Sequence, residues 1–498
     1  MLFNSIEYLF FLPIVFLIYW AIGYARIYDS LKLRLQNAFV VLASYVFYGW
    51  WDWRFLLLIA FTSLCSYGSG LLIARGVQKD AEEPRGGQNV LFASKLWLIA
   101  NIVVDVGILA IFKYYNFFVG SFADLFGLQN SIHSLKIVLP LGISFFTFQA
   151  IAYVVDVYKR KIESMNLVDC LLYIGFFPKL FAGPIERPTN LIPQIQKPRV
   201  FEYDLAVDGC RQMLWGLFKK VVIADNAALY VNQVYGDYAN QSGSTLLLAA
   251  ILYTIQIYGD FSGYSDMAIG TAKLLGFRFR DNFLFPYFSR NMNEFWRRWH
   301  ISLNTWFVDY VYIPLGGSRN GKWHTIRNTM IIFLLSGLWH GANWTFIAWG
   351  AYHGILLVAL ILLNRNTKYN QVVASGRWLP SIKELGQMLL VFLLATIGWV
   401  LFRAPSMADA WHYLCGMMQF GTLRACYRFF LPDENLLYPT NVLIIIMFVV
   451  EWLLRDKRHG FDIAHIHPVL RYVLIVLLFL MIVFFMPVAP SQFIYFQF

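Results

Sequence analysis

Charged side chains are scarce in this sequence. Asp, Glu, Lys and Arg make up 14% of its 498 residues, whereas ordinary soluble domains contain roughly 25%. Hydrophobic residues reach 59%, and apolar runs of about 20 residues, long enough to cross a hydrocarbon core about 30 Å thick, recur from end to end. The shortage of charge argues against a set of soluble domains and predicts a single polytopic membrane domain over residues 1–498.

Other signals are absent as well. The five cysteines show no C-x-x-C or other metal-like spacing, so they decide little. No positive residue precedes the first apolar run, MLFNSIEYLFFLPIVFLIYW, which therefore lacks a secretory n-region and is predicted to be a retained first span. No internal repeat is visible, which weighs against a secondary transporter because many transporters are built from repeats.

The net charge of +11 would suggest a nucleic-acid partner in a soluble protein. Membrane proteins, however, collect Lys and Arg in their cytoplasmic loops. No basic stretch interleaves with exposed aromatic residues outside the apolar runs. We therefore expect contact with membrane lipid and no binding of nucleic acid.

The apolar runs predict an all-α polytopic membrane protein with about eleven to thirteen transmembrane helices and re-entrant segments. Loops 24–35, 75–95 and 158–166 are rich in Lys and Arg, whereas loop 118–137 has only Lys136. The positive-inside rule then places the N-terminus outside, and the uncharged tail beyond the basic RDKRHG stretch outside as well. The candidate spans are 5–23, 36–51, 54–74, 96–117, 138–157, 167–182, 206–230, 244–273, 326–363 (two spans), 384–402, 440–454 and 470–487.

Two segments, 174–192 and 283–325, are interrupted by proline and glycine and cannot form straight helices. At membrane depth, irregular backbone is tolerated only where it is buried in protein or lines a wet cavity. We therefore predict re-entrant structure in both segments.

His300 lies in the second of these segments, within NEFWRRWHISLNTWF (293–307). If 293–307 forms one helix, His300 falls on the same apolar face as Trp296 and Phe307, opposite Arg298. An ionisable side chain at membrane depth is costly and is therefore a candidate functional residue, and imidazole suits proton transfer near neutral pH. The alternative is a core histidine that is hydrogen-bonded to the backbone.

His340 follows an uncharged run, MIIFLLSGLW, with Gly337 and Gly341 beside it. These glycines thin the helix so that another backbone or a substrate can approach. Burial disfavours the charged imidazolium, so the ring can accept a proton as a general base does. A structural histidine is the alternative. His353 would face another direction if the same helix continued, and we leave it out of the site.

A metal site is not favoured by this pattern. Zinc needs three or four ligands at short spacings, whereas His300 and His340 have no H-x-x-x-H pattern and no cysteine nearby. We expect no metal and no bound cofactor.

Arginines and acids accompany the two histidines. Clustered arginines suit recognition of a phosphate or an acidic surface, with positive-inside anchoring as the alternative. In YGDFSGYSDMAIG, Asp260 and Tyr264 share a helix face at i, i+4 and could line a polar path or form a structural cluster. The arginines are Arg290, Arg297 and Arg298.

The chain ends in FIYFQF (493–498). An aromatic, uncharged tail is usually an interface anchor. Tyr495, however, places a hydroxyl on the predicted outer face, and a base-activated hydroxyl can act as a covalent carrier. Both interpretations stay open on the residues alone.

Several motifs together resemble the membrane-bound O-acyltransferase family. They are YGDFSGYSDMAIGTAKLLGF, FPYFSRNMNEFWRRWHISLNTWFVDYVYIPLGG and LWHGANWTFIAWGAYHG, and FNSIEYLFFLPIV, FFPKLFAGPIERP and WVLFRAPSMADA extend the match over nearly the whole chain. The signature core covers about 174–364. The motifs are specific for a branch similar to the alginate O-acetyltransferases and D-alanyl-transfer proteins, and much less specific for the substrate.

This resemblance implies a ring of tilted helices in which a tunnel from the cytoplasm meets a funnel from outside. It implies a cytoplasmic thioester donor, acetyl-CoA or an acyl-carrier protein, and a C-terminal motif that is proposed to present a tyrosine as acyl carrier. The catalytic residues that it implies are His340, His300 and Tyr495. From the residues themselves we assign donor binding to Arg290, Arg297, Arg298 and Trp296, and the lining of the tunnel to Asp260, Tyr264 and Asn343.

We therefore predict an acyltransferase in a bacterial inner membrane, with both termini extracytoplasmic, that acetylates a polysaccharide such as alginate. His340 would deprotonate or orient the acceptor hydroxyl, His300 would position the thioester, and Tyr495 would pass the acyl group to an extracytoplasmic SGNH-type acetyltransferase or esterase. The alternatives are D-alanyl transfer from a carrier protein to teichoic acid, and a proton-coupled transporter or flippase.

Overall fold

The computed structural model describes residues 1–82, 88–127, 135, 137–366, 369, 371–419, 437–487 and 491–494. Within these ranges the regular elements are helices, and no β-strand occurs among them. The all-α prediction is confirmed, as expected for apolar segments that must satisfy their backbone hydrogen bonds internally. Tyr495 lies outside the described residues.

The chain forms two compact units. The first comprises Met1–Gly209 with Ala268–Arg280, and the second comprises Cys210–Met267 with Asp281–Phe498. Both candidate histidines belong to the second unit.

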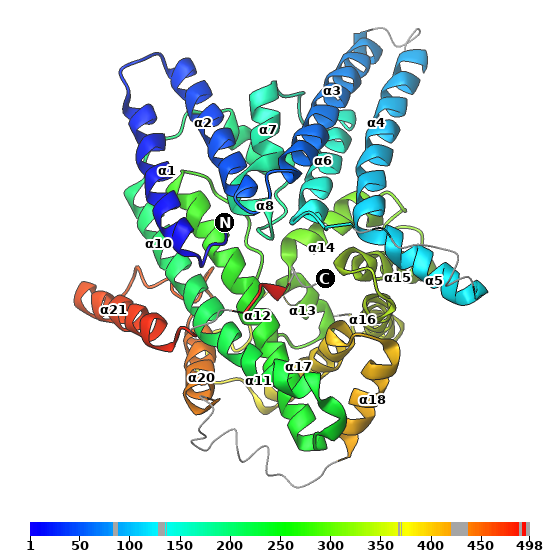
Figure 1. Cartoon of the computed structure of the whole chain (residues 1–498), viewed down its shortest axis with the longest axis vertical. Coiled ribbons are helices and arrows are strands. Elements are labelled where there is room, and N and C mark those ends of the chain that lie inside the picture. Colours follow the sequence, from blue (N-terminus) through cyan, green and yellow to red (C-terminus); the bar gives the residue numbers. More distant parts are fainter. Residues whose placement is uncertain are drawn as a thin grey trace. The chain divides into compact units, whose positions relative to one another are not determined.

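Long apolar helices and short broken ones make up the first unit. The predicted irregularity of 174–192 is confirmed, because only two short helices form around Pro178 and Pro188 and the chain between them is buried. The helices of this unit are α1 (Ile6–Tyr24), α2 (Asp29–Gly49), α3 (Phe55–Glu82), α4 (Gln88–Leu109), α5 (Tyr115–Phe126), α6 (Ile143–Tyr158), α7 (Leu167–Gly175), α8 (Phe177–Leu180) and α9 (Pro188–Ile195). Figure 1 shows α3 and α4 running side by side.

Two long helical segments link the units. α10 (Tyr203–Leu217) continues through a π-helical stretch, Phe218–Ala224, into α11 (Asp225–Gly236). α12 (Gly243–Leu274) has most of its length in the second unit. The other helices of the second unit are α13 (Met292–Arg298), α14 (Ile301–Phe307), α15 (Lys322–His340), α16 (Trp344–Leu362), α17 (Ile382–Arg403), α18 (Met407–Met418), α20 (Leu437–Leu453) and α21 (Pro468–Phe485).

Among the described residues, seven helical segments are long and apolar enough to cross a membrane, by length and composition. The remaining predicted spans correspond to helices that are shorter or more polar, such as α7 and α15. The multi-pass class is therefore confirmed. The seven segments are Ile6–Tyr24, Phe55–Asp80, Phe92–Phe126, Gly243–Leu274, Trp344–Leu362, Ile382–Arg403 and Pro468–Phe485.

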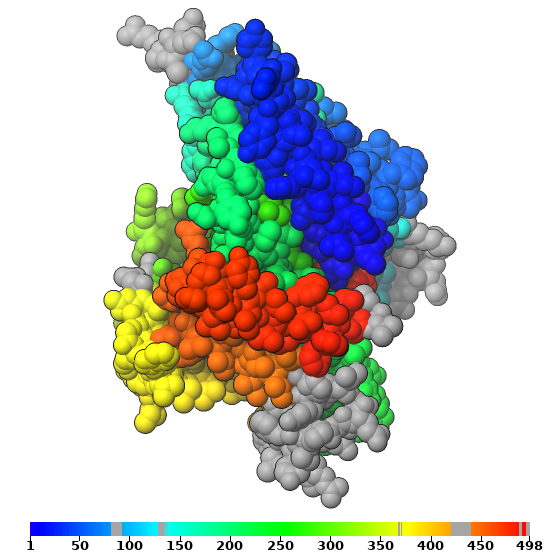
Figure 2. Space-filling view, turned by 90° about the vertical axis from the view of Figure 1, so that its left-hand side faces the viewer, coloured from blue at the N-terminus to red at the C-terminus, as the bar shows by residue number. Residues whose placement is uncertain are grey.

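These segments differ sharply in burial. In α12, 89% of the apolar window is buried, whereas in α21 only 11% is. Figure 2 shows α21 as an orange-red ridge of uncovered side chains on the molecular surface. An apolar helix with so little protein cover suits a lipid-facing position, and α12 suits the interior.

The prediction of one helix over 293–307 is wrong. α13 ends at Arg298, Trp299 is extended, and His300 adopts a left-handed conformation with φ 44° and ψ 52° before α14 begins. A neighbouring segment competes for the backbone here: Leu284 N–H donates to the Arg298 carbonyl at 3.0 Å, and Ile301 N–H donates to the Asn282 carbonyl at 2.9 Å. These tertiary bonds replace the i to i−4 bonds of a continuous helix.

Candidate active site

The structure brings His300 and His340 together. Their ring centroids lie 6.4 Å apart, and the side chains are 1% and 5% exposed. One histidine precedes α14 and the other ends α15, so the pair is assembled from two elements.

The backbone break at His300 sets the position of its ring. A non-glycine residue with positive φ is uncommon, although histidine is among the residues that tolerate it best. Asn282 supports the turn, because its carboxamide oxygen accepts a hydrogen bond from the Ser302 hydroxyl at 2.9 Å. The ring lies 4.6 Å from Phe261 and 5.9 Å from Trp339, measured between centroids. His300 therefore faces an apolar interior, as predicted, although by a different backbone route.

His340 ends its helix because Gly341 is extended and does not continue α15. Its ring lies 5.0 Å from both Trp339 and Trp349, and 5.2 Å from Phe402. Trp339 thus contacts both histidines. An aromatic enclosure of this kind keeps bulk water away from the ring.

The predicted close approach of another backbone beside His340 is confirmed at Gly337, whereas Gly341 lies beyond the end of α15. A Cβ on Gly337 would lie 2.2 Å from the carbonyl oxygen of Phe346, and a Cβ on Gly341 would lie 2.1 Å from the Phe346 ring. The backbone that approaches is therefore that of α16. Figure 1 shows α15 and α16 side by side.

His353 lies nearer to the site than predicted. It belongs to α16, a separate helix, and it is fully buried with its ring 4.9 Å from Trp296 and 5.1 Å from Trp349. The helical extrapolation from His340 was wrong because the chain turns at Gly341. A Cβ on Gly398 would lie 2.5 Å from His353 Nε2, so α17 packs directly on this ring and favours a structural role.

The three predicted arginines fall into two groups. Arg290 and Arg298 both pair with Glu294 at 3.0 Å, and Arg290 also lies 3.7 Å above the ring of Tyr369. Arg297 is exposed, and within the described part of the chain no carboxylate pairs with it. Two of the arginines thus hold α13 in place, whereas Arg297 can meet a ligand.

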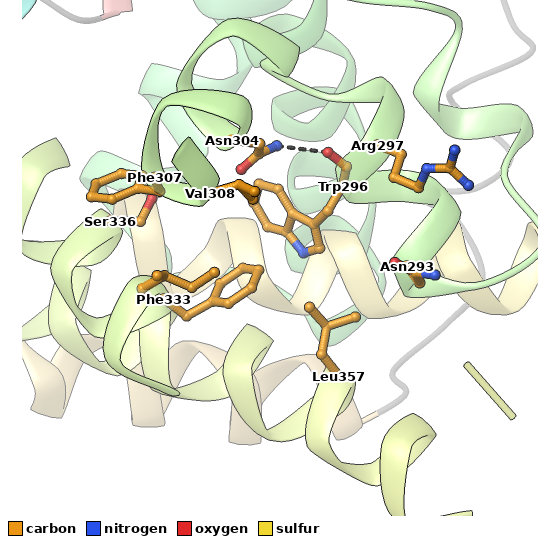
Figure 3. Close-up of a pocket in the computed structure, with 10 residues that line it drawn as sticks. Asn293, Trp296, Arg297, Asn304, Phe307, Val308, Phe333, Ser336 and Leu357 are labelled. Carbon is orange, nitrogen blue, oxygen red and sulfur yellow. Dashed lines mark hydrogen bonds between the residues drawn. The ribbon is translucent and has the colours of Figure 1, made fainter. Parts of the chain in front are cut away.

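A cavity of ≈ 160 Å³ opens beside Arg297, with the Trp296 indole as one wall (Figure 3). Asn304 and Ser336 line it and lie one helical turn from His300 and His340 respectively. Asn304 donates to the Trp296 carbonyl at 2.6 Å, which fixes this wall. The Arg297 guanidinium points away from the aromatic wall in Figure 3, at the rim of the cavity.

The predicted tunnel-lining residues have different surroundings. Asp260 and Tyr264 lie on α12, where Asp260 pairs with Lys220 at 2.7 Å. Asn343 caps α16: its side chain accepts from Thr345 N–H and donates to the Pro405 carbonyl at 2.8 Å. Both ends of its carboxamide are thereby committed to backbone.

Buried charges that the sequence analysis missed lie beside α12. Lys219 and Lys220 are each 3% exposed; Lys219 pairs with Asp266, and Lys220 with Asp225 and Asp260, all at 2.7 Å. Glycines let the end of α10 pack closely on α12. A Cβ on Gly216 would lie 2.5 Å from the Gly263 carbonyl of α12. The two lysines in the apolar stretch WGLFKKVVIAD were the available signal. In the part of the chain that the structure describes, no group of three or more His, Cys, Asp or Glu side chains could hold a metal ion.

Comparison with known proteins is consistent with this geometry. Residues 3–396 match the MBOAT family, membrane-bound O-acyltransferases. The chain is 41% identical over 428 residues to a protein of Pseudomonas aeruginosa named probable alginate O-acetylase AlgI, covering 85% of this chain and 76% of that one. It is 31% identical to the peptidoglycan O-acetyltransferase of Helicobacter pylori, over 100% of this chain and 98% of that one. The teichoic acid D-alanyltransferase of Bacillus subtilis is 29% identical and covers 48% of this chain and 63% of its own length.

Proposed function

This chain belongs to the membrane-bound O-acyltransferase family, and on that premise we propose that it transfers an acetyl group from a cytoplasmic thioester to a polysaccharide outside the membrane. It is a multi-pass acyltransferase. The observation that carries the proposal is the convergence of His300 and His340 in one aromatic enclosure, with ring centroids 6.4 Å apart. The family match sets aside the transporter or flippase alternative.

The chemistry requires one base and one positioning group. His340 removes the proton from an acceptor hydroxyl, whose oxygen attacks the thioester carbonyl carbon and forms the new ester bond. The carbon–sulfur bond breaks, and the leaving thiolate takes the proton from the imidazolium. His300 orients the thioester. Both rings are close enough for one reacting group to contact each of them.

We place the donor's route past Arg297 and through the cavity walled by Trp296, because Asn304 and Ser336 of its lining lie one helical turn from the two histidines. Acetyl-CoA and an acyl-carrier protein share a phosphopantetheine arm, whose phosphate suits an arginine and whose chain suits a narrow apolar passage. A cavity of ≈ 160 Å³ is comparable to one that holds a benzene-sized ligand. A volume of this size can hold one segment of the phosphopantetheine arm. Arg290 and Arg298 support the site by holding Glu294 and α13.

The similarity to O-acetylating proteins indicates the acceptor. Both O-acetylating relatives match 85% or more of this chain, whereas the D-alanyltransferase matches 48%. We therefore place this protein in polysaccharide O-acetylation, with alginate as the first acceptor to test, and keep D-alanyl transfer to teichoic acid as the second. We further propose that the protein lies in a bacterial inner membrane with both termini outside the cytoplasm. Tyr495 then carries the acyl group to an SGNH-type partner.

The test is His340→Ala in cells that acetylate the polysaccharide. Loss of a positioned general base should lower acetylation by about 10²- to 10⁴-fold, while the amount of protein in the membrane stays normal. His324→Ala, an exposed histidine on α15, is the matched control. Normal acetylation in His340→Ala would overturn the proposal. The donor can be identified in proteoliposomes by measuring transfer of the labelled acyl group. The donors to compare are acetyl-CoA, an acyl-carrier protein charged with acetyl, and a carrier protein charged with D-alanine.

A further inference from the structure

The segment just before Tyr495 is held inside the second unit. Phe493 and Ile494 are 2% and 0% exposed, and Figure 1 shows the short red segment 491–494 beside α12. The backbone N–H of Ile494 donates to Asp260 Oδ2 at 2.7 Å. A simple interface anchor would not need a buried partner for its backbone.

Ser491 makes two further polar contacts at the same place. Its hydroxyl donates to Asp225 Oδ1 at 2.5 Å, and its carbonyl oxygen accepts from Lys220 Nζ at 3.2 Å. Four consecutive residues therefore supply three hydrogen bonds to charged side chains, a class of bond stronger than its neutral counterpart.

The receiving cluster has a surplus of acceptors. Lys220 lies 2.7 Å from both Asp225 and Asp260, and all three side chains are 3% exposed or less. One ammonium faces two carboxylates, and carboxylates in an apolar interior need additional donors. Ser491 and Ile494 supply one donor each. The charges of the cluster and the polar groups of the segment are thus complementary.

Aromatic contacts connect the segment to the histidines. The Phe493 ring lies 4.8 Å from Tyr264 and 6.4 Å from Phe261, and Phe261 lies 4.6 Å from His300. One aromatic ring therefore separates the docked segment from the candidate active site. The residue that follows this segment is Tyr495.

We infer that Asp225, Asp260 and Lys220 form a docking site for Ser491–Ile494 and act as positioning residues that keep Tyr495 near the histidine pair. The inference rests on the proposed function in which Tyr495 accepts the acyl group. A free tail would visit the thioester rarely, whereas an anchored one converts the encounter into a near-unimolecular step. Asp260 thus acts through the tail and not on the substrate.

Docking can be measured without any activity. In the full chain with its five native cysteines replaced by serine, Ile494→Cys reports burial of the segment through its rate of maleimide modification. We expect it to react about tenfold more slowly than Met486→Cys, a reference position that is 56% exposed. Adding Asp260→Ala should bring the two rates within about threefold.

Activity then tests positioning. We expect Phe493→Ala to lower kcat for acetyl transfer by about tenfold and Ser491→Ala by about threefold. The donor KM should be unchanged, because these two side chains hold the tail and do not bind the donor. Gln492→Ala, an exposed neighbour in the same segment, is the matched control. Asp260→Asn keeps an acceptor oxygen for the Ile494 N–H. Its loss of activity should therefore be about half of the loss caused by Asp260→Ala.

Two results would overturn the inference: modification of Ile494→Cys as fast as the reference, or undiminished acetyl transfer in Asp260→Ala when labelling shows that the segment is released. Failure of the proposed function has a separate signature, which is transfer retained in His340→Ala whatever the labelling rates are.

Discussion

At the scale of single residues, a side chain can bind a ligand only if no structural hydrogen bond or salt bridge already occupies its polar atoms. Arg290 and Arg298 both form salt bridges with Glu294, so residue type alone does not distinguish a ligand-binding arginine from a structural one. Asn343 likewise uses its side chain to cap α16 and to bond the Pro405 carbonyl. Arg297 differs because it lines the cavity and is exposed. Within the described ranges it is the member of the arginine cluster that has no carboxylate partner.

Arg297→Ala should therefore raise the donor KM by about tenfold with little change in kcat, since a hydrogen bond to a charged group contributes roughly 1.5–3 kcal/mol. Initial rates over a range of acetyl-CoA concentrations measure this effect. Arg319→Ala removes an exposed arginine that does not line the cavity and is the control. Equal KM values for the two variants would exclude Arg297 from donor binding.

Arg298→Ala should act differently, because it removes a salt bridge to Glu294 and a hydrogen bond to the Leu284 carbonyl that help hold the break before His300. We expect a lower thermal midpoint in detergent and a fall in kcat, with the donor KM nearly unchanged. A tenfold rise in KM with normal stability would instead place Arg298 at the donor.

At the scale of elements, the histidines meet because two helices stop. α13 stops at Arg298, where Leu284 and Asn282 take over the backbone hydrogen bonds, and α15 stops at Gly341. Glycine also brings α15 against α16, since Phe346 occupies the space that a side chain at 337 would need. The position of His340 therefore depends on how closely these two helices pack.

Gly337→Ala should push α15 away from α16 and lower stability by about 1–3 kcal/mol, the usual cost of overpacking. Acetyl transfer should fall with it, because His340 lies less than one turn away. Gly386→Ala on α17 has nothing within 4 Å of the new Cβ and should be neutral or slightly stabilising. Thermal unfolding of both variants in the same detergent makes the comparison, and equal midpoints would contradict this account of the packing.

At the scale of the whole molecule, the chain returns its C-terminal segment to the interior of the second unit. Ser491–Ile494 contact Lys220, Asp225 and Asp260, which are more than two hundred residues away in sequence. The apolar α21 just before them is largely uncovered. A segment that follows a largely uncovered apolar helix and then buries Phe493 and Ile494 suits a functional part better than a simple anchor.

Tyr495→Phe separates the carrier from the anchor. The substitution removes only the hydroxyl, so protein level and membrane insertion should stay normal while polysaccharide acetylation falls by at least about 100-fold. Gln497→Ala is the control within the same tail. The acetyl content of purified polysaccharide measures the outcome, and undiminished acetylation would assign the tail to anchoring.

Composition and local pattern by themselves determined the class of this protein. Apolar runs specify membrane helices because an unpaired backbone group in lipid is too costly. Local sterics also predict that the proline-rich stretch near 178–188 breaks a helix. They predict as well that the glycines around His340 allow another backbone to come close. The same reasoning selected His300 and His340. Packing decided the rest. The competing bonds of Asn282 and Leu284 break the helix before His300, and burial of Lys220 between two aspartates directs Asp260 toward the tail. Apart from the neighbouring pair Lys220 and Asp225, these outcomes depend on contacts between separate elements, whose interaction free energies no local pattern contains.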